Sequence, residues 1–162
     1  MSVLQLFLER LSNAPFALAI RNGAVLFPWL ECAHVLAITL VVGTIAIVDL
    51  RLLGLRAHRN SVDRLIVEML PYTWGAFGVA VITGGLMFAA NATSYAQNPQ
   101  FQLKLALIGI AGINMVVFHF MVHRRIAEWD ELYPPPLAAR AAGAASLSLW
   151  ISVVVLGRWV GF

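Results

Sequence analysis

Glu31 and His34 are the two residues of this sequence whose types and spacing best suit chemistry in an apolar environment. A carboxylate and an imidazole three positions apart on a helix share one face, where they can exchange protons or bind a metal or a heme iron. They stand at the start of a run, Val35 to Val48, that carries no charge. Ionisable groups are costly inside a membrane, so a functional role is the first hypothesis for this pair.

Three other polar residues are expected at the same depth, and with the first two they form a predicted outer cluster. Its members are Glu31, His34, Asn91, Lys104 and Arg158. An acid, an imidazole and cations can bind a quinol headgroup and accept its protons, ligate a metal, or supply one axial histidine to a b-type heme. The alternative is a set of internal ion pairs and of long side chains that reach the membrane surface.

A second, inner group of polar residues is expected near the opposite surface. Its members are Asp49, Arg51, His58, Tyr72, His119 and His123. His34 and His119 are the first candidates for ligation of heme or metal, yet residue counts place them roughly 18 Å apart in depth at 1.5 Å per residue. The two should therefore not clamp one heme within one chain. The alternative for His119 is a buried imidazole bonded to a polar neighbour, while His58 and His123 are expected to be solvated or interfacial.

The composition is that of an integral membrane protein. The chain has 162 residues, of which 60% are hydrophobic and only 12% charged, with a mean hydropathy of +0.82, whereas soluble domains have about 25% charged residues. The net charge of +3 comes without any run of Lys and Arg, so it indicates membrane topology rather than nucleic-acid binding. The single cysteine, Cys32, excludes an intrachain disulfide.

We expect one domain with four membrane-spanning helices. A bilayer core of about 30 Å requires about 20 residues per helix. The segments of suitable length and composition are residues 28–53, 71–90, 101–122 and 141–162. Residues 1–27 are expected to form an interfacial segment that begins with an amphipathic helix over 2–11. The predicted fold class is an all-α membrane protein, a four-transmembrane-helix bundle with an N-terminal interfacial helix.

Basic residues concentrate at two of the three connections between the spans. They are Arg51, Arg56, Arg59, Arg64, Arg124, Arg125 and Arg140. By the positive-inside rule these connections are cytoplasmic and both termini are external. For a multi-pass protein of a bacterial inner membrane, the external side is the periplasm.

Several short motifs resemble those of a known family. They are Glu31-Cys-Ala-His34, Val48-Asp-Leu-Arg-Leu-Leu-Gly54, Pro71-Tyr-Thr-Trp74, Thr83-Gly-Gly-Leu86, Lys104-Leu105, Ala111-Gly-Ile-Asn114 and Phe118-His119. This pattern, from Trp29 to His123, resembles a family of small bacterial inner-membrane proteins classed as a domain of unknown function. More distantly, the four-helix bundle with intramembrane histidines is similar to b-type cytochrome membrane subunits and copper-resistance-type membrane domains.

The leading functional hypothesis is a membrane redox subunit that binds a b-type heme or a quinone. One alternative is a cofactor-free structural or assembly subunit of a membrane complex, and another is a small metal-ion or solute permease. The uncharged middle of the first span, Val35 to Val48, argues against the polar path that a permease requires. Small residues on several helix faces predict a homo-oligomer or a subunit of a larger complex in the lipid bilayer. The sequence does not establish an enzyme.

Overall fold

The fold is a helical bundle with four helices long and apolar enough to cross a membrane. The structure is a computed structural model that describes residues 3–55, 61–130 and 134–160, and within these ranges it contains no strand. The candidate spans are α3 (Leu26–Leu52), α4 (Val62–Ala90), α6 (Pro99–Val117) with its continuation to Trp129, and α8 (Leu137–Val160). The predicted all-α class and the number of spans are confirmed.

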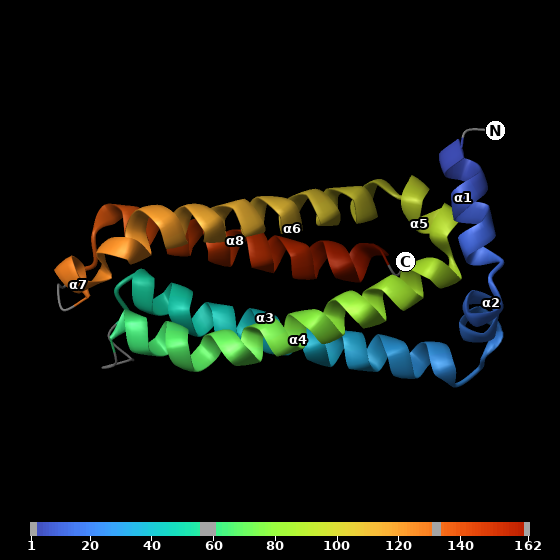
Figure 1. Ribbon diagram of the computed structural model, residues 1–162, viewed down its shortest axis with the longest axis horizontal. Coiled ribbons are helices and arrows are strands. Elements are labelled where there is room, and N and C mark those ends of the chain that lie inside the picture. Colours follow the sequence, from blue (N-terminus) through green and yellow to red (C-terminus); the bar gives the residue numbers. More distant parts are fainter. Residues whose placement is uncertain (1–2, 56–60, 131–133, 161–162) are drawn as a thin grey trace.

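The four long helices associate as two antiparallel pairs. Helix α3 packs along α4, α6 packs along α8, and the two pairs meet where α3 contacts α8 (Figure 1). The helices α1 (Val3–Ser12), α2 (Pro15–Asn22) and α5 (Ala92–Gln97) lie at one end of the bundle, and α7 (Ile126–Trp129) lies at the other. We call these the outer and the inner end. The chain termini lie toward the outer end, as an even number of spans requires.

The second span begins nine residues earlier than predicted, at Val62 instead of Pro71. The charged residues before Pro71 indicated a loop, but they lie on the exposed side of a helix, where Arg64 and Glu68 form an ion pair of 2.8 Å. Val62 and Leu65 are buried on its other side. Pro71 therefore lies within α4. The helix thus extends beyond the apolar segment predicted to span the membrane, because an amphipathic stretch outside the apolar core can continue a spanning helix.

The third span changes its helical form at the inner end. Asn98 caps the start of α6 by accepting hydrogen bonds from the backbone N–H groups of Gln100 and Phe101, at 2.9 and 3.1 Å. After Val117 the chain continues as a π-helical segment, η1 (Phe118–Val122), and a short 3-10 segment, η2 (His123–Arg125). The widened turn of a π-helix changes which side each following residue faces.

The other spans also differ from the predicted limits by a few residues. Helix α3 begins at Leu26 instead of residue 28 and ends at Leu52. Helix α8 begins at Leu137 instead of residue 141, directly after the proline segment. The N-terminal amphipathic helix is Val3–Ser12, and the predicted start at Ser2 lies outside the described residues, as do Arg56, His58, Arg59 and Tyr133.

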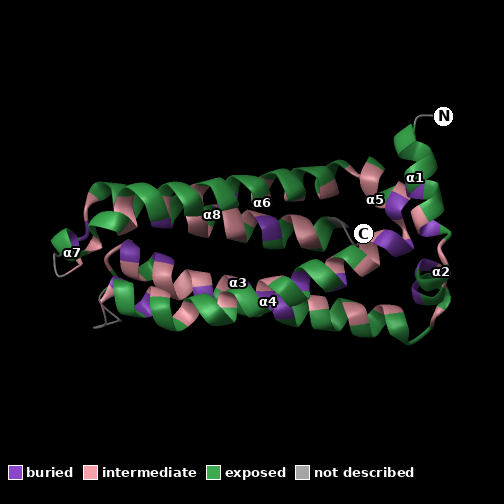
Figure 2. Ribbon diagram, in the orientation of Figure 1, coloured by how far each residue is buried: buried purple, intermediate pink, exposed green. Residues whose placement is uncertain are grey.

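Buried residues occur mainly at the two ends of the bundle and between α3 and α4 (Figure 2). At the inner end Leu52, Val62, Trp129 and Ala139 form one cluster. At the outer end the hydroxyl of Ser12 accepts a hydrogen bond from the backbone N–H of Ala92 at 3.0 Å. This bond joins the α1–α2 layer to the start of α5. The outward faces of the long helices are apolar and exposed, as expected for surfaces that face lipid.

Candidate functional site

His34 is held in place by the facing helix α4. Its Nδ1 atom lies 2.9 Å from Oγ1 of Thr83. The same hydroxyl lies 2.7 Å from the carbonyl oxygen of Val79, which can only accept a hydrogen bond. The short distance to Val79 favours donation of the single hydroxyl proton to that carbonyl, so that Thr83 accepts from Nδ1–H of His34. The imidazole also makes a hydrogen bond with the backbone of Ala80. In this tautomer Nε2 of His34 carries a lone pair and can accept a proton or ligate a metal.

Gly84 gives the imidazole the space that it occupies. A Cβ atom at position 84 would lie only 2.8 Å from Cε1 of His34 and 3.4 Å from its Nδ1. Such contacts are too short for a side chain, so glycine is required for the ring to lie against the backbone of α4. The neighbouring Gly85 has open space at the same atom. The Thr83-Gly84 pair thus provides one hydrogen bond and one close approach for the same ring.

Lys104 of α6 is an electrostatic neighbour of His34. The lysine is half-buried, and its Nζ lies 3.3 Å from the position that a Cβ on Gly157 would take. Gly157 belongs to the last turn of α8. The negative end of a helix dipole stabilises a cation there, so the C-terminal end of α8 is a favourable place for the ammonium group.

The outer edge of the site is formed by Glu31 and aromatic rings. Burial raises the pKa of the Tyr95 hydroxyl on α5, and the nearby carboxylate of Glu31 raises it further. The rings of Phe88 and Phe101 stack with centroids 5.4 Å apart, and Tyr95 lies 5.6 Å from Phe101. These three rings join α4, α5 and α6 at the outer end. We call Glu31, His34, Thr83, Gly84, Tyr95 and Lys104 the outer site.

The family of this chain is shown by a match that extends well beyond the outer site. A family model fits residues 17–162, which includes α2 and all four long helices. The chain belongs to DUF6644, a family of unknown function. No curated protein and no solved structure matches the chain. The resemblance to a domain of unknown function is confirmed, and the match is longer than the motifs between Trp29 and His123 indicated.

Three of the predicted outer residues in this DUF6644 chain contribute to the outer site. His34 and Lys104 are electrostatic neighbours, and Glu31 acts on Tyr95. Asn91 ends α4, and its backbone carbonyl accepts from the N–H of Tyr95 at 3.1 Å. Arg158 is exposed in the last turn of α8, next to Gly157. Asn91 therefore borders the outer site through its backbone carbonyl, and Arg158 borders it through its neighbour in the chain, Gly157.

His119 lies at the inner end, in η1, on the far side of the bundle from the helix ends that hold His34. Its ring is exposed and stacks on that of His123, with centroids 5.3 Å apart. Nε2 of His123 lies 3.3 Å from Oδ1 of Asp63, without hydrogen-bond geometry. Within the described residues, no three His, Cys, Asp or Glu side chains are grouped to hold a metal ion.

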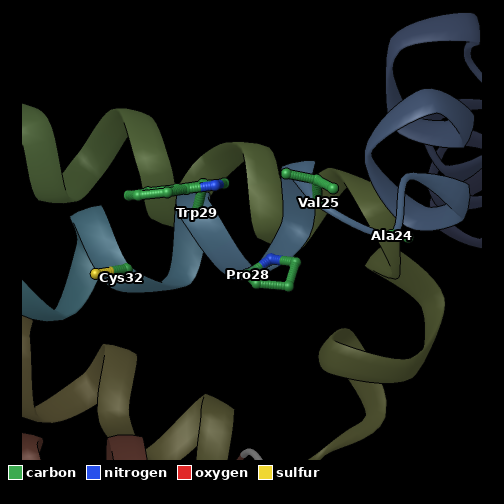
Figure 3. Close-up of a pocket in the computed structure, with 5 residues that line it drawn as sticks. All are labelled: Ala24, Val25, Pro28, Trp29 and Cys32. Atoms are coloured by element: carbon green, nitrogen blue, oxygen red, sulfur yellow. The ribbon is translucent and has the colours of Figure 1, made fainter.

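A shallow apolar hollow of about 370 Å³ lies at the start of α3 (Figure 3). It is lined by Ala24, Val25, Pro28, Trp29 and Cys32. At 100° per residue, Cys32 lies about 160° around the helix from His34. The hollow thus opens on the side of α3 away from the outer site, and Trp29 at its edge is 68% exposed. It lacks the polar groups that would orient a ligand.

Thr83, Gly84 and Tyr95 were not among the predicted site residues. A depth count could have found the first two, because Thr83 lies seven residues before the end of α4 and His34 lies eight residues after the start of α3. Residues at equal depth on antiparallel neighbours are candidates for contact, although depth alone does not fix the rotation of either helix. Tyr95 was not predicted because its segment, expected as a simple connection, folds into α5.

Proposed function

We propose that this DUF6644 protein is a membrane redox subunit that binds the headgroup of a quinone or quinol at the outer site. The observation that carries the proposal is the fixed ring of His34, whose Nδ1 is hydrogen-bonded to Thr83 and whose imidazole has Lys104 as an electrostatic neighbour. A quinol hydroxyl can donate to Nε2 of this ring. An ammonium group nearby stabilises the negative charge that develops when the proton leaves.

The arrangement supports a direction for the protons. His34 accepts a proton from the quinol as a general base. Glu31 is exposed at the outer edge of the site and can pass the proton to the external water. Oxidation of a quinol to a quinone releases two protons and two electrons, so His34 would accept the two protons one after the other, and a redox centre of a partner subunit would be needed to accept the electrons. A homo-oligomer or a larger complex in the membrane is therefore part of this proposal.

A b-type heme fits the described residues less well. His34 can supply one axial nitrogen, but the other described histidines, His119 and His123, belong to the inner end. A bis-histidine heme at the outer site would need its second ligand from a neighbouring chain. Bound there, heme would supply one-electron chemistry, and Lys104 would stabilise its anionic groups. The quinone is thus the better supported ligand.

Binding of a short-chain ubiquinone to the protein in lipid nanodiscs tests the proposal. Quenching of the fluorescence of its five tryptophans reports occupancy. We expect saturable binding that His34→Ala reduces at least tenfold, because the variant removes the acceptor for the headgroup. His119→Ala, at the inner end, is the matched control and should bind as tightly as the unchanged protein.

A reduced-minus-oxidised visible spectrum and a pyridine hemochrome assay of the same preparation measure heme. Sharp α and β bands that correspond to one heme per chain and are lost in His34→Ala would show that the ligand of this site is heme and not a quinone. Neither quinone binding nor heme would contradict the redox proposal and favour a cofactor-free assembly subunit. Equal quinone binding by His34→Ala would remove the outer site from the proposal.

A further inference from the structure

Asp49 is a second ionisable group within the apolar part of the bundle, and the proposed function does not use it. It lies on α3, three residues before the helix ends at Leu52. Its residue is only 4% exposed. The Oδ2 atom of its carboxyl group is fully buried and has no hydrogen-bond partner in the described structure. A buried polar atom without a partner is rare and requires an explanation.

The carboxyl group of Asp49 lies at a tightly packed contact between α3 and α8. Ser146 of α8 provides its one side-chain hydrogen bond. Beside it, a Cβ on Gly143 would lie 3.0 Å from the Asp49 carbonyl oxygen and 2.9 Å from Cβ of Leu52. The backbones of α3 and α8 therefore lie close together at Asp49. Glycine at such a place is typical of membrane helices in contact.

The charged groups near the inner end are engaged elsewhere or exposed. Arg51, on the same helix, donates to the backbone carbonyl of Asp130 at 3.4 Å. Asp63 of α4 lies next to His123, and Arg140, one turn before Gly143 on α8, is exposed. Burial and the bond to Ser146 are the influences on the Asp49 carboxyl, and no charged group of the described chain is among them.

An ionised carboxylate in this position would lack both water and a cation, which is strongly unfavourable. We propose that Asp49 is an intramembrane proton-binding site, which carries its proton in the folded protein and, on losing it to the inner side, weakens the contact between α3 and α8. The proton on one oxygen removes the charge that the close contact cannot accommodate. Asp49 lies three residues before the end of α3, so the inner end is the nearer side for exchange of the proton.

Loss of the proton would affect the whole bundle, because α3 and α8 carry the main contact between the two helix pairs. A charge between them attracts water and separates the close backbones at Gly143. The effect is independent of any ligand at the outer site. It follows from the position of Asp49 alone, so it does not depend on the proposed quinone function.

Infrared spectroscopy tests protonation directly, because the C=O stretch of a carboxylic acid is separated from that of a carboxylate. We expect the unchanged protein at neutral pH to show an acid band that is absent from Asp49→Asn. The matched control is Asp63→Asn, which removes an exposed carboxylate at the same end and should leave the band unchanged. Absence of the band from the unchanged protein at neutral pH, or its presence in Asp49→Asn, would overturn the proposal.

Ser146→Ala provides an assignment that does not require Asp49→Asn to fold. Removal of the hydroxyl that bonds to Asp49 should shift the acid band in frequency without abolishing it. A band that Ser146→Ala leaves at its original frequency would belong to another residue and contradict the assignment.

Stability as a function of pH tests the consequence for the helix contact. If the folded protein holds a proton that the unfolded chain releases, the unfolding equilibrium constant rises up to tenfold per pH unit in the range where the two states differ. Asp49→Asn cannot lose this proton, so its stability should depend less on pH than that of the unchanged protein. Equal pH dependence of the two proteins would contradict the proposed weakening.

Discussion

At the outer site, Gly84 of α4 determines where the imidazole of His34 can lie. A Cβ atom at position 84 would lie only 2.8 Å from Cε1 of the His34 imidazole. The position of the ring therefore depends on the absence of a Cβ atom at Gly84 as well as on the hydrogen bond between Nδ1 and Thr83. Its orientation determines which nitrogen is available, and this is the property on which the proposed ligand depends.

Gly84→Ala is expected to displace the ring of His34 and to reduce binding of short-chain ubiquinone about tenfold or more, equivalent to about 1.4 kcal/mol. Gly85→Ala is the matched control, because a Cβ there meets no atom within 4 Å. Fluorescence titration in nanodiscs measures both. Equal affinities of the two variants would mean that the ligand does not depend on the position of His34.

Thr83→Val replaces the hydroxyl with a methyl group of similar size. His34 then loses the acceptor for its Nδ1–H, and we expect a loss of about 1–3 kcal/mol, shared between stability and binding, for a buried donor without a partner. Thr83→Ser keeps the hydroxyl and should restore most of the loss. Failure of serine to restore it would show that packing, rather than the hydrogen bond, is what Thr83 contributes.

At the scale of helices, two contacts determine how the spans are arranged. The inner end of α4 is capped from a distance, because Asp130 accepts a hydrogen bond from the backbone N–H of Val62 at 2.6 Å. Ser61 caps the same helix locally through the N–H of Arg64 at 3.2 Å. Where α3 meets α8, Gly143 allows the backbones to touch.

Asp130→Ala is expected to destabilise the first turn of α4 by about 1 kcal/mol, because it removes the side chain that accepts from the N–H groups of Val62 and Asp63. Hydrogen exchange of the amide of Val62 reports this turn directly and should become faster. An unchanged exchange rate would indicate that the helix begins closer to Pro71, as the charge pattern predicted.

Gly143→Ala is expected to lower the free energy of unfolding by roughly 1–3 kcal/mol, the cost of overpacking a close contact. The added Cβ would lie 3.0 Å from the Asp49 carbonyl oxygen, which is backbone and cannot rotate away. Gly112→Ala in α6, where a Cβ has open space, is the control. Thermal unfolding in detergent should separate the two variants. If both behave alike, the α3–α8 contact is looser than described.

At the scale of the molecule, the bundle is polar at its ends and apolar along its length. The outer site lies near one end and Asp49 near the other, with spans of mean hydropathy between 1.6 and 2.2 around them. The basic residues near the inner end predict that this end is cytoplasmic. The outer site would then face the periplasm of a bacterial inner membrane.

Cysteine labelling of intact cells tests this orientation. Cys32→Ser provides a background without cysteine, since the chain has only one. In this background Ser94→Cys, at an exposed position of α5, should react with a membrane-impermeant maleimide from outside. Arg64→Cys, at the inner end, should react only after permeabilisation. The reverse pattern would invert the topology and place the outer site on the cytoplasmic side.

The sequence by itself determined the class of the protein and the number of its spans. Long uncharged runs such as Val35 to Val48 can be stable only in lipid or among other helices, so the four spans follow from composition and length. The depth of a residue also follows from its place along a helix. The separation of His34 from His119 was predictable for this reason.

Only the tertiary structure decided which residues at equal depth face one another. Rotation of a helix about its axis depends on packing with its neighbours, and the weak amphipathicity of spanning helices does not encode it. Thr83 and Gly84 thus became partners of His34, and Ser146 and Gly143 became neighbours of Asp49. The start of α4 at Val62 was likewise a tertiary result, because the cap from Asp130 comes from a segment 68 residues away.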